Sequence, residues 1–404
     1  MESYFGTGAG GRGGRYDRPW LNTEFDDAMD RGNGGRLFGL RRVGKSTEAE
    51  ACIERQRDRA GVTAIHLNAE GCGNEGKMLL DLLKILPQKG WLEHVTARIG
   101  ANNAIALAVR EGLQKFTGTP ADLTDYFAPI AEAIESTLGK ADRLVLVIDE
   151  FPWLARSILE ADPARGRSRV NQLLATLRRW RGGEHGMRML LVGSIGMAAL
   201  GRRYDLDLSH LRDMAFLEVP PLEDNEANEF ITALAQGVTG WSDGHTTALL
   251  EESVAYYPSV LQAGFQYMTP GTKALPLARI PDLFADKVRP NLDQNFFSQF
   301  DKRVQLYREL PPPSPDLLRT ILDLVMKAPD QQLPYPDLCA ALAVALPTQA
   351  GGPPVFDDAD LGEALTILRE DGFVSVRAPR NAPQIWRAAS GLVTAWWSQR
   401  HGGA

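Results

Sequence analysis

The alternation of apolar and polar positions divides the chain into short runs that favour strands and longer runs that favour helices. Leu144 to Ile148 is a continuous apolar run, which is typical of a strand buried on both faces of a parallel sheet. Similar β-forming runs predict strands at 62–68, 187–192 and 215–219, with a further short one at Leu37 and Phe38. Because helical patterns separate these runs, the sequence predicts an α/β fold with a parallel sheet.

Helix-forming patterns occupy most of the remaining chain. In the first half they fall at 20–31, 76–87, 91–99, 102–116, 121–138 and 167–181. In the second half they fall at 223–236 and 246–268, followed by a mixed helical stretch at 276–310. The chain ends with helices at 315–327, 335–345 and 358–370, β-forming runs at 373–376 and 385–387, and a last helix that carries Trp396 and Trp397. We expect the two tryptophans to be packing residues, and three helices followed by a hairpin are typical of a winged helix.

These patterns predict four parts. Residues 1–16 are rich in Gly and Arg and poor in apolar residues, so we expect a flexible tail. Residues 17–221 would form the α/β core, 222–310 a helical lid and connector, and 311–404 the winged-helix domain. The run Pro311-Pro312-Pro313 marks the last boundary because proline breaks regular structure.

Composition excludes several classes of protein. The chain has 404 residues, a net charge of −7 and a hydrophobic fraction of 44%. The acidic balance gives the whole molecule no general attraction to nucleic acid or to anionic membranes. Three scattered cysteines and six scattered histidines suggest buried thiols, a reducing compartment and no metal beyond one bound with a nucleotide. No signal sequence or membrane-length apolar run is present, so we expect a cytoplasmic protein without membrane contact.

The chemistry centres on Gly39-x-x-x-x-Gly44-Lys45-Ser46, the phosphate-binding P-loop. A short strand pattern precedes it and a helical pattern follows it, which is the context that the motif requires. Glycines let the backbone wrap an anion with its N–H groups inward, and the helix N-terminus adds partial positive charge. We therefore expect ATP and Mg²⁺ as cofactors, with Lys45 reaching the β- and γ-phosphates and Ser46 holding the metal. The residues expected around the phosphates are Gly39, Leu40, Arg41, Arg42, Val43, Gly44, Lys45, Ser46 and Thr47.

An acidic pair follows the central apolar run. Asp149 and Glu150 come directly after Leu144 to Ile148, at the end of a strand where open α/β sheets bind ligands. Taken alone, such a pair is often a solvated strand end; after a P-loop it is the expected Walker B motif. Asp149 would hold Mg²⁺ through water, and Glu150 would polarise the water that attacks the γ-phosphate.

For two further sets of candidate residues, a purely structural role is the alternative to a catalytic one. Ser194 follows the strand at 187–192, where it would sense the γ-phosphate and orient the attacking water, or would simply cap the next helix. In oligomeric ATPases of this layout, an arginine of the following segment reaches a neighbour's γ-phosphate. The candidates are Arg202, Arg203 and Arg212, and each of them is alternatively a surface residue.

With these motifs in hand, the chain resembles the STAND-class P-loop ATPases, which combine an AAA+-like core, a helical lid and a winged helix. The resemblance rests on GLRRVGKS (39–46), LVIDEFPWL (146–154), LLVGSIGM (190–197), FLEVPPL (216–222), YYPSVLQ (256–262) and TAWW (394–397). It implies sheet order 5-1-4-3-2, an adenine contact near Pro258, and ATP binding and hydrolysis coupled to oligomerisation or to a protein partner. Three features depart from the family: Tyr256 stands where a glycine is usual, the insertion between the second and third strands is long, and no repeat array follows the winged helix.

Three functions remain open. The first is an ATPase switch that controls a protein partner or its own assembly. The second is a DNA-associated ATPase, similar to initiators and loaders, that uses the winged helix. The third is a nucleotide-binding scaffold that does not hydrolyse ATP. Residues 314–404 contain ten acidic and seven basic residues, and Asp357, Asp358 and Asp360 begin the helix that would enter a DNA groove, which disfavours DNA.

Overall fold

The computed structural model describes residues 15–31, 33–85, 127–138, 143–182, 187–346, 356–380 and 382–402. Their packing separates the chain into two compact units. The sheet unit comprises Arg18–Phe38 and Glu48–Glu218. The C-terminal unit comprises Met1–Asp17, Gly39–Thr47 and Val219–Ala404, so the P-loop packs with the second half of the chain.

The sheet unit contains a five-stranded sheet in the order β2-β3-β4-β1-β5. Every neighbouring pair of strands runs parallel. The order confirms the predicted 5-1-4-3-2 arrangement and the α/β class. The strands are β1 (Gly34–Phe38), β2 (Val62–Asn68), β3 (Arg143–Asp149), β4 (Arg188–Gly193) and β5 (Ala215–Phe216).

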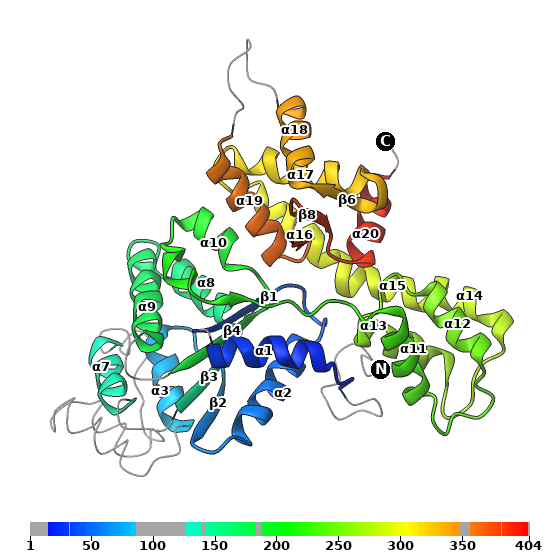
Figure 1. The fold of residues 1–404 in the computed structure, drawn as a ribbon, viewed down its shortest axis with the longest axis horizontal. Coiled ribbons are helices and arrows are strands. Elements are labelled where there is room, and N and C mark those ends of the chain that lie inside the picture. The colour runs from blue at the N-terminus through cyan, green and yellow to red at the C-terminus, as the bar shows by residue number, and fades with distance from the viewer. Residues whose placement is uncertain are drawn as a thin grey trace. The chain divides into compact units, whose positions relative to one another are not determined.

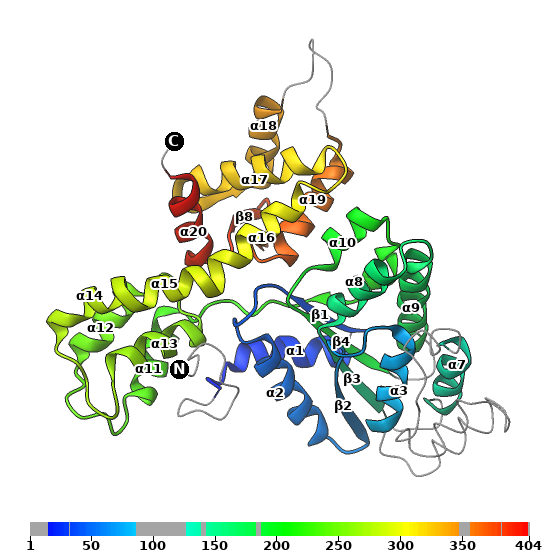
Figure 2. The same ribbon diagram turned by 180° about the vertical axis from the view of Figure 1, so that it is seen from behind.

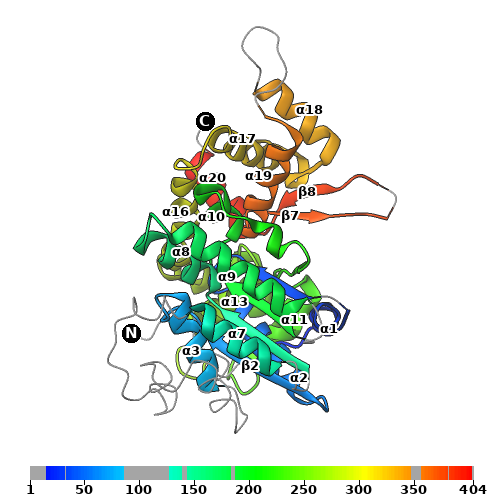
Figure 3. The same ribbon diagram turned by 90° about the vertical axis from the view of Figure 1, so that its left-hand side faces the viewer.

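Helices cover both faces of this sheet (Figures 1 and 3). On one face, Leu146 and Ile148 of β3 and Leu191 of β4 belong to a continuous apolar core with the helices that follow β2, β3 and β4. The helices α1 and α2 lie against the other face. Among the described residues, the helices of this unit are α1 (Pro19–Arg31), α2 (Lys45–Arg57), α3 (Glu75–Ile85), α7 (Phe127–Leu138), α8 (Phe151–Ala161), α9 (Gly166–Arg181), α10 (Met197–Tyr204) and η1 (Leu208–Leu211).

Several expectations for this unit need correction. The strand predicted at Leu37 and Phe38 begins earlier, because Gly34 and Gly35 already belong to β1. Gly34 has φ 96°, and a Cβ there would lie 1.8 Å from the Met189 carbonyl oxygen of the neighbouring strand. Helix α8 was missed, and the last strand ends at Phe216. The helices predicted at 91–99 and 102–116 lie outside the described residues.

The C-terminal unit begins with a group of helices: α11 (Asp224–Leu234), α12 (Asp243–Glu252) and α13 (Pro258–Met268). The single helix predicted at 246–268 is therefore wrong. Pro258 occupies the first turn of a new helix, where its missing N–H costs nothing, and Tyr257 before it is extended. An almost unbroken helical run follows, which we call the connector helix (residues 277–307; Figure 2). It consists of η2 (Leu277–Arg279), α14 (Ile280–Leu283), η3 (Phe284–Val288), α15 (Arg289–Leu292), η4 (Asp293–Phe297) and α16 (Ser298–Tyr307).

The remainder combines helices with a small antiparallel sheet in the order β6-β8-β7. The short strand β6 was missed. Trp396 is buried, with its ring centroid 5.2 Å from that of Phe300 and 5.5 Å from that of Phe373, and Trp397 is buried beside it. The prediction that both tryptophans are packing residues is confirmed. The elements are α17 (Ser314–Lys327), η5 (Pro329–Gln331), β6 (Gln332–Pro334), α18 (Tyr335–Ala345), α19 (Asp358–Glu370), β7 (Val374–Arg377), β8 (Ile385–Ala388) and α20 (Gly391–His401).

The cysteines follow the prediction only in part. Cys52 and Cys72 are buried, whereas Cys339 is partly exposed. Burial raises the pKa of the Cys52 thiol to about 12, which keeps it protonated and unreactive at neutral pH. No helix among the described residues has the length and apolar character needed to cross a membrane.

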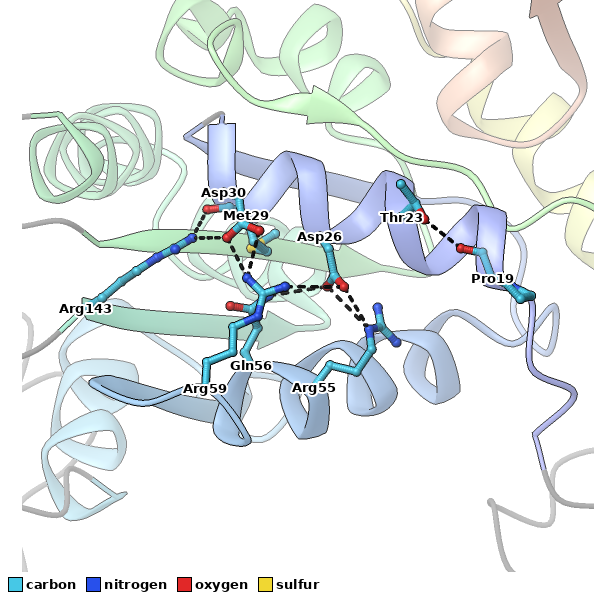
Figure 4. A network of polar contacts seen from close by, with 9 residues as sticks. All are labelled: Pro19, Thr23, Asp26, Met29, Asp30, Arg55, Gln56, Arg59 and Arg143. Atoms are coloured by element: carbon cyan, nitrogen blue, oxygen red, sulfur yellow. Dashed lines mark hydrogen bonds and ion pairs between the residues drawn. The ribbon is translucent and has the colours of Figure 1, made fainter.

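Ion pairs bind α1 to its neighbours in the sheet unit (Figure 4). Asp30 accepts hydrogen bonds from Arg59 of the α2–β2 connection, at 2.6 and 2.7 Å, and from Arg143 of β3 at 2.9 Å. One turn earlier, Asp26 pairs with Arg55 of α2 at 3.2 Å. Two acidic residues of one helix thus contact both the next helix and a strand, and this holds α1 against the sheet.

We expect Asp30→Asn to lower the free energy of unfolding by about 1 kcal/mol or less at pH 7, since the pairs are partly exposed. Partial burial acts to raise the pKa of Asp30, but hydrogen bonds with Arg59 and Arg143 outweigh it and lower the pKa. The contribution is therefore present above the ordinary aspartate pKa of about 3.9 and is lost as the pH falls below it. Thermal unfolding from pH 7 to pH 3 measures this. The exposed Asp58→Asn is the matched control, and an equal loss in both variants would contradict the assignment.

Candidate functional site

The P-loop has the backbone conformation that an anion-binding loop requires. Gly39 and Gly44 have φ angles of 146° and 102°, values that residues with a Cβ rarely adopt. Arg42 also has a positive φ, of 69°. The helix α2 starts at Lys45, so the loop ends at a helix N-terminus, where backbone N–H groups and the helix dipole favour an anion.

Lys45 lies inside this loop. Its side chain is buried, and Nζ donates a hydrogen bond to the Gly39 carbonyl at 3.1 Å and another to the Leu40 carbonyl. These bonds hold the ammonium within the loop that Gly39 begins. A buried cation beside a run of N–H groups is a donor set that suits a phosphate chain, so the residues present fit a nucleoside triphosphate. The assignment of Lys45 to the β- and γ-phosphates stays a prediction.

One face of the connector helix contacts the P-loop within the C-terminal unit. The Arg41 N–H donates to Gln299 Oε1 at 2.9 Å, and Arg42 Nη1 donates to Asn295 Oδ1 at 2.5 Å. One turn further along, Arg303 Nη2 approaches the Gly39 carbonyl at 3.4 Å. Residues four apart lie on the same face of a helix, so this face forms a polar stripe, defined as Asn295, Gln299, Arg303 and Tyr307.

The same stripe reaches the end of α19. Arg303 Nε lies 3.5 Å from Asp371 Oδ1, and Tyr307 donates to Asp371 Oδ2 at 2.7 Å. All three side chains are buried. Burial first, and the Asp371 charge second, raise the pKa of the Tyr307 phenol well above its ordinary value, so Tyr307 remains a donor. Gly39 is thereby connected through Arg303 to Asp371, just before β7.

In the sheet unit, the acidic pair lies at the carboxyl end of β3. Asp149 is buried, and its Oδ1 accepts the Glu150 N–H at 2.9 Å. Its Oδ2 lies 3.8 Å from His66 Nε2 on the adjacent strand, too far for a hydrogen bond. Glu150 caps α8 with left-handed backbone angles, φ 56° and ψ 32°. Such angles are costly for a residue with a side chain and concentrate at functional sites.

Glu150 and Ser194 are brought together. Glu150 Oε2 accepts a hydrogen bond from the Ser194 N–H at 3.1 Å and from the Ser194 hydroxyl at 2.9 Å. The alternative that Ser194 caps the next helix is wrong, because α10 begins at Met197 with Gly196 as its cap. Trp153 Nε1 donates to the same Ser194 hydroxyl oxygen at 2.9 Å.

The other candidate residues have defined positions in the structure, and their roles stay predictions. Arg202 and Arg203 lie in the last turn of α10, and Arg212 is exposed after η1. Ser46 is exposed in the first turn of α2. Pro258 begins α13, and the next residue, Ser259, donates to the Arg42 carbonyl of the P-loop at 2.5 Å.

Sequence reasoning missed four residues around these features: His66, Trp153, Arg303 and Asp371. His66 lies within the strand predicted at 62–68, and its register opposite Val147 in β3 places it near Asp149. Trp153 stood inside the motif at 146–154, three residues after Glu150, a spacing that predicts proximity on a helix. Nothing in the sequence could indicate that Arg303 and Asp371 meet, since 67 residues lie between them.

Comparison with known proteins supports the fold. No protein-family model matches the chain, and no curated protein matches it by sequence. Among solved structures, it is similar to a Walker-type ATPase of Pyrococcus abyssi, with a TM-score of 0.50 and 15% identity over 95% of both chains. It is also similar to the ORC2 protein of Aeropyrum pernix in its ADP form (TM-score 0.49, 13% identity, 99% and 98% of the two chains) and to Drosophila ORC bound to DNA (0.37, 11%, 94% and 85%).

The likeness to the Pyrococcus protein covers almost the whole of both chains and supports the α/β fold. We draw nothing further from the two likenesses whose TM-scores lie below 0.5. The STAND class stays a prediction. The chain has the α/β fold of a Walker-type P-loop ATPase.

Proposed function

We propose that this chain binds ATP at its P-loop and hydrolyses it. The observation that carries the proposal is the buried Lys45 ammonium held inside a loop whose glycines have the positive φ angles of an anion cradle. Leu40 to Thr47 would supply the N–H groups and side chains around the phosphates, and Pro258 would lie near the adenine. Cradling of phosphates by backbone N–H groups and a lysine is the mechanism of P-loop proteins.

The chemistry would be carried by this chain's own carboxylates. Ser46 and Asp149 are the proposed ligands of Mg²⁺, which supplies positive charge against the phosphates when bound. Glu150 would accept a proton from the attacking water, and Ser194 would hold that carboxylate. Arg202, Arg203 and Arg212 remain proposed candidates for contact with a neighbouring subunit's nucleotide, which would make hydrolysis depend on assembly.

The connector helix supports a role as a nucleotide-dependent switch. Its polar stripe contacts the P-loop backbone at Gly39 and Arg41 and, through Arg303 and Tyr307, the buried Asp371. A change in the P-loop on binding ATP would alter these contacts, because buried charged groups tolerate little displacement from their partners. The switch would act on the C-terminal α17–α20 region, whose helices and β7–β8 hairpin we propose to be a winged helix.

Binding and chemistry can be separated with two variants. We expect Lys45→Ala to weaken ATP binding by at least tenfold, because it removes the cation that meets the phosphates. Glu150→Gln is the matched variant: it should bind ATP within about twofold of wild type and lose about 10²- to 10⁴-fold in turnover. Titration calorimetry with ATP and Mg²⁺ and a phosphate-release assay measure the two quantities.

Each variant tests a different part of the proposal. Unchanged ATP affinity in Lys45→Ala, with the fold intact by circular dichroism, would contradict the P-loop assignment. Normal turnover in Glu150→Gln would exclude Glu150 as the catalytic carboxylate. ATP binding by wild type without any turnover would leave the non-hydrolysing scaffold as the function.

The proposed switch predicts that substitution of Asp371 weakens the response of the C-terminal region to ATP. We expect ATP to change amide hydrogen exchange in β7 and β8 of the wild type, and Asp371→Asn to reduce that change at least twofold while ATP affinity stays within about threefold. The substitution keeps an acceptor for Tyr307 but removes the charge beside Arg303. Asp337→Asn, an exposed position of α18, is the control. An ATP-dependent change of equal size in all three proteins would exclude coupling through the contact of Arg303 with Asp371.

A DNA-associated ATPase is the second candidate function. Arg377 and Arg380 are exposed at the β7–β8 hairpin and form no ion pair with any described residue, and the exposed Arg387 donates to Ser375 at 3.2 Å. These are suitable phosphate contacts. Against them stands the acidic start of α19, where Asp357 and Asp360 cap the helix reciprocally.

Fluorescence anisotropy of a labelled duplex, measured with the full chain across a salt series, discriminates the two functions. If the three arginines make the only phosphate contacts, the logarithm of affinity should fall with the logarithm of salt at a slope of about −3, in the weak non-specific range. Arg377→Ala combined with Arg380→Ala should remove about two units of that slope. Sub-micromolar binding at physiological salt with a steeper slope would place the DNA-associated function ahead of the protein switch.

A further inference from the structure

Trp153 is joined to the acidic pair by a chain of hydrogen bonds within the sheet unit. Its indole N–H donates to the Ser194 hydroxyl oxygen at 2.9 Å, and that hydroxyl donates to Glu150 Oε2 at 2.9 Å. The Ser194 backbone N–H donates to the same carboxylate oxygen at 3.1 Å. Trp153, Ser194 and Glu150, which come from two segments of the chain, thus form one continuous series of hydrogen bonds.

The chemistry of the donors sets the direction of these hydrogen bonds. An indole N–H can only donate, and a serine hydroxyl carries a single proton. Because the Ser194 oxygen accepts from Trp153, its lone proton is directed to Glu150. Oε2 therefore receives two hydrogen bonds from Ser194, while Oε1 receives none from the part of the chain that the structure describes.

The scaffold fixes Trp153 in this place. Trp153 lies in the first turn of α8, whose neighbouring residues Phe151 and Leu154 are fully buried. The start of α8 approaches β4 so closely that a Cβ on Gly193 would lie 2.4 Å from the ring of Pro152. Arg156 also contacts the indole, with its guanidinium carbon 5.1 Å from the ring centroid. The packing of α8 and the contact of Arg156 with the ring face thus together fix the position of the indole.

We propose that Trp153 is a positioning residue for ATP hydrolysis, an inference that rests on the ATPase function proposed above. By directing the Ser194 hydroxyl to Oε2, Trp153 leaves Oε1 as the oxygen that takes the proton of the attacking water. The water oxygen then bonds to the γ-phosphorus as the bond to the bridging oxygen breaks, and the electron pair leaves with ADP. The proton on Glu150 passes to solvent before the next turnover.

The variant Trp153→Phe, made in the full chain, removes the N–H and keeps an aromatic ring in a partly exposed position. We expect kcat to fall about tenfold, with KM and the ATP dissociation constant within twofold of wild type, because the lost bond acts on the reacting carboxylate and not on nucleotide binding. Trp20→Phe, at a tryptophan that is 48% exposed, is the control and should leave kcat unchanged.

A double-mutant cycle distinguishes positioning from a general structural role. If Trp153 acts through Ser194, Trp153→Phe should cost no further activity in a Ser194→Ala background, because the hydroxyl that it orients is already absent. A structural role would instead multiply the two losses. Multiplied losses, or a change in KM that accounts for the whole effect of Trp153→Phe, would overturn the inference.

The cycle also separates failure of the inference from failure of the proposed function. Absence of turnover in wild type, or full turnover in Glu150→Gln, would overturn the ATPase assignment and the inference with it. Normal kcat in Trp153→Phe, together with loss of turnover in Glu150→Gln, would overturn the inference alone.

Discussion

Parallel pairing of β3 with β4 is the constraint on which the acidic part of the candidate site depends. Their register places Ile148 opposite Leu191, so the two strands end at the same edge of the sheet. Glu150 and Ser194, one residue beyond each strand, therefore meet although 43 residues lie between them in the sequence. Apolar side chains are buried on both faces of these strands, and their close packing against the covering helices maintains this register.

The phosphate loop depends on a different constraint, the spacing of side chains along the connector helix, which includes π-helical turns at Phe284–Val288 and Asp293–Phe297. Side chains four residues apart, from Asn295 to Tyr307, form a single polar stripe. The stripe satisfies backbone groups of the P-loop at one end and a buried carboxylate, Asp371, at the other. Breaking a buried charge pair typically costs several kcal/mol, so the P-loop and the C-terminal sheet are bound to one helix by contacts that resist separation.

Local chemistry made much of this protein predictable. Apolar runs located β2 and β3, and the P-loop followed directly from Gly39 to Ser46, because phosphate binding needs particular residues at fixed spacing. The sheet order followed only from the resemblance, and the structure confirmed it. Predictions failed where neighbours in space overrode local pattern. Gly34 lies outside the apolar run that predicted β1, yet it belongs to that strand and packs closely against the Met189 carbonyl.

The sequence alone therefore determined the α/β class, the phosphate loop and the acidic pair, since each is written in consecutive residues. Only the tertiary structure decided that Ser194 holds Glu150 and does not cap α10, and that Trp153 directs its hydroxyl. It also decided that Arg303 reaches both the P-loop and Asp371. These contacts join residues distant in sequence, and their geometry depends on strand register and helix packing, which no local pattern of residues encodes.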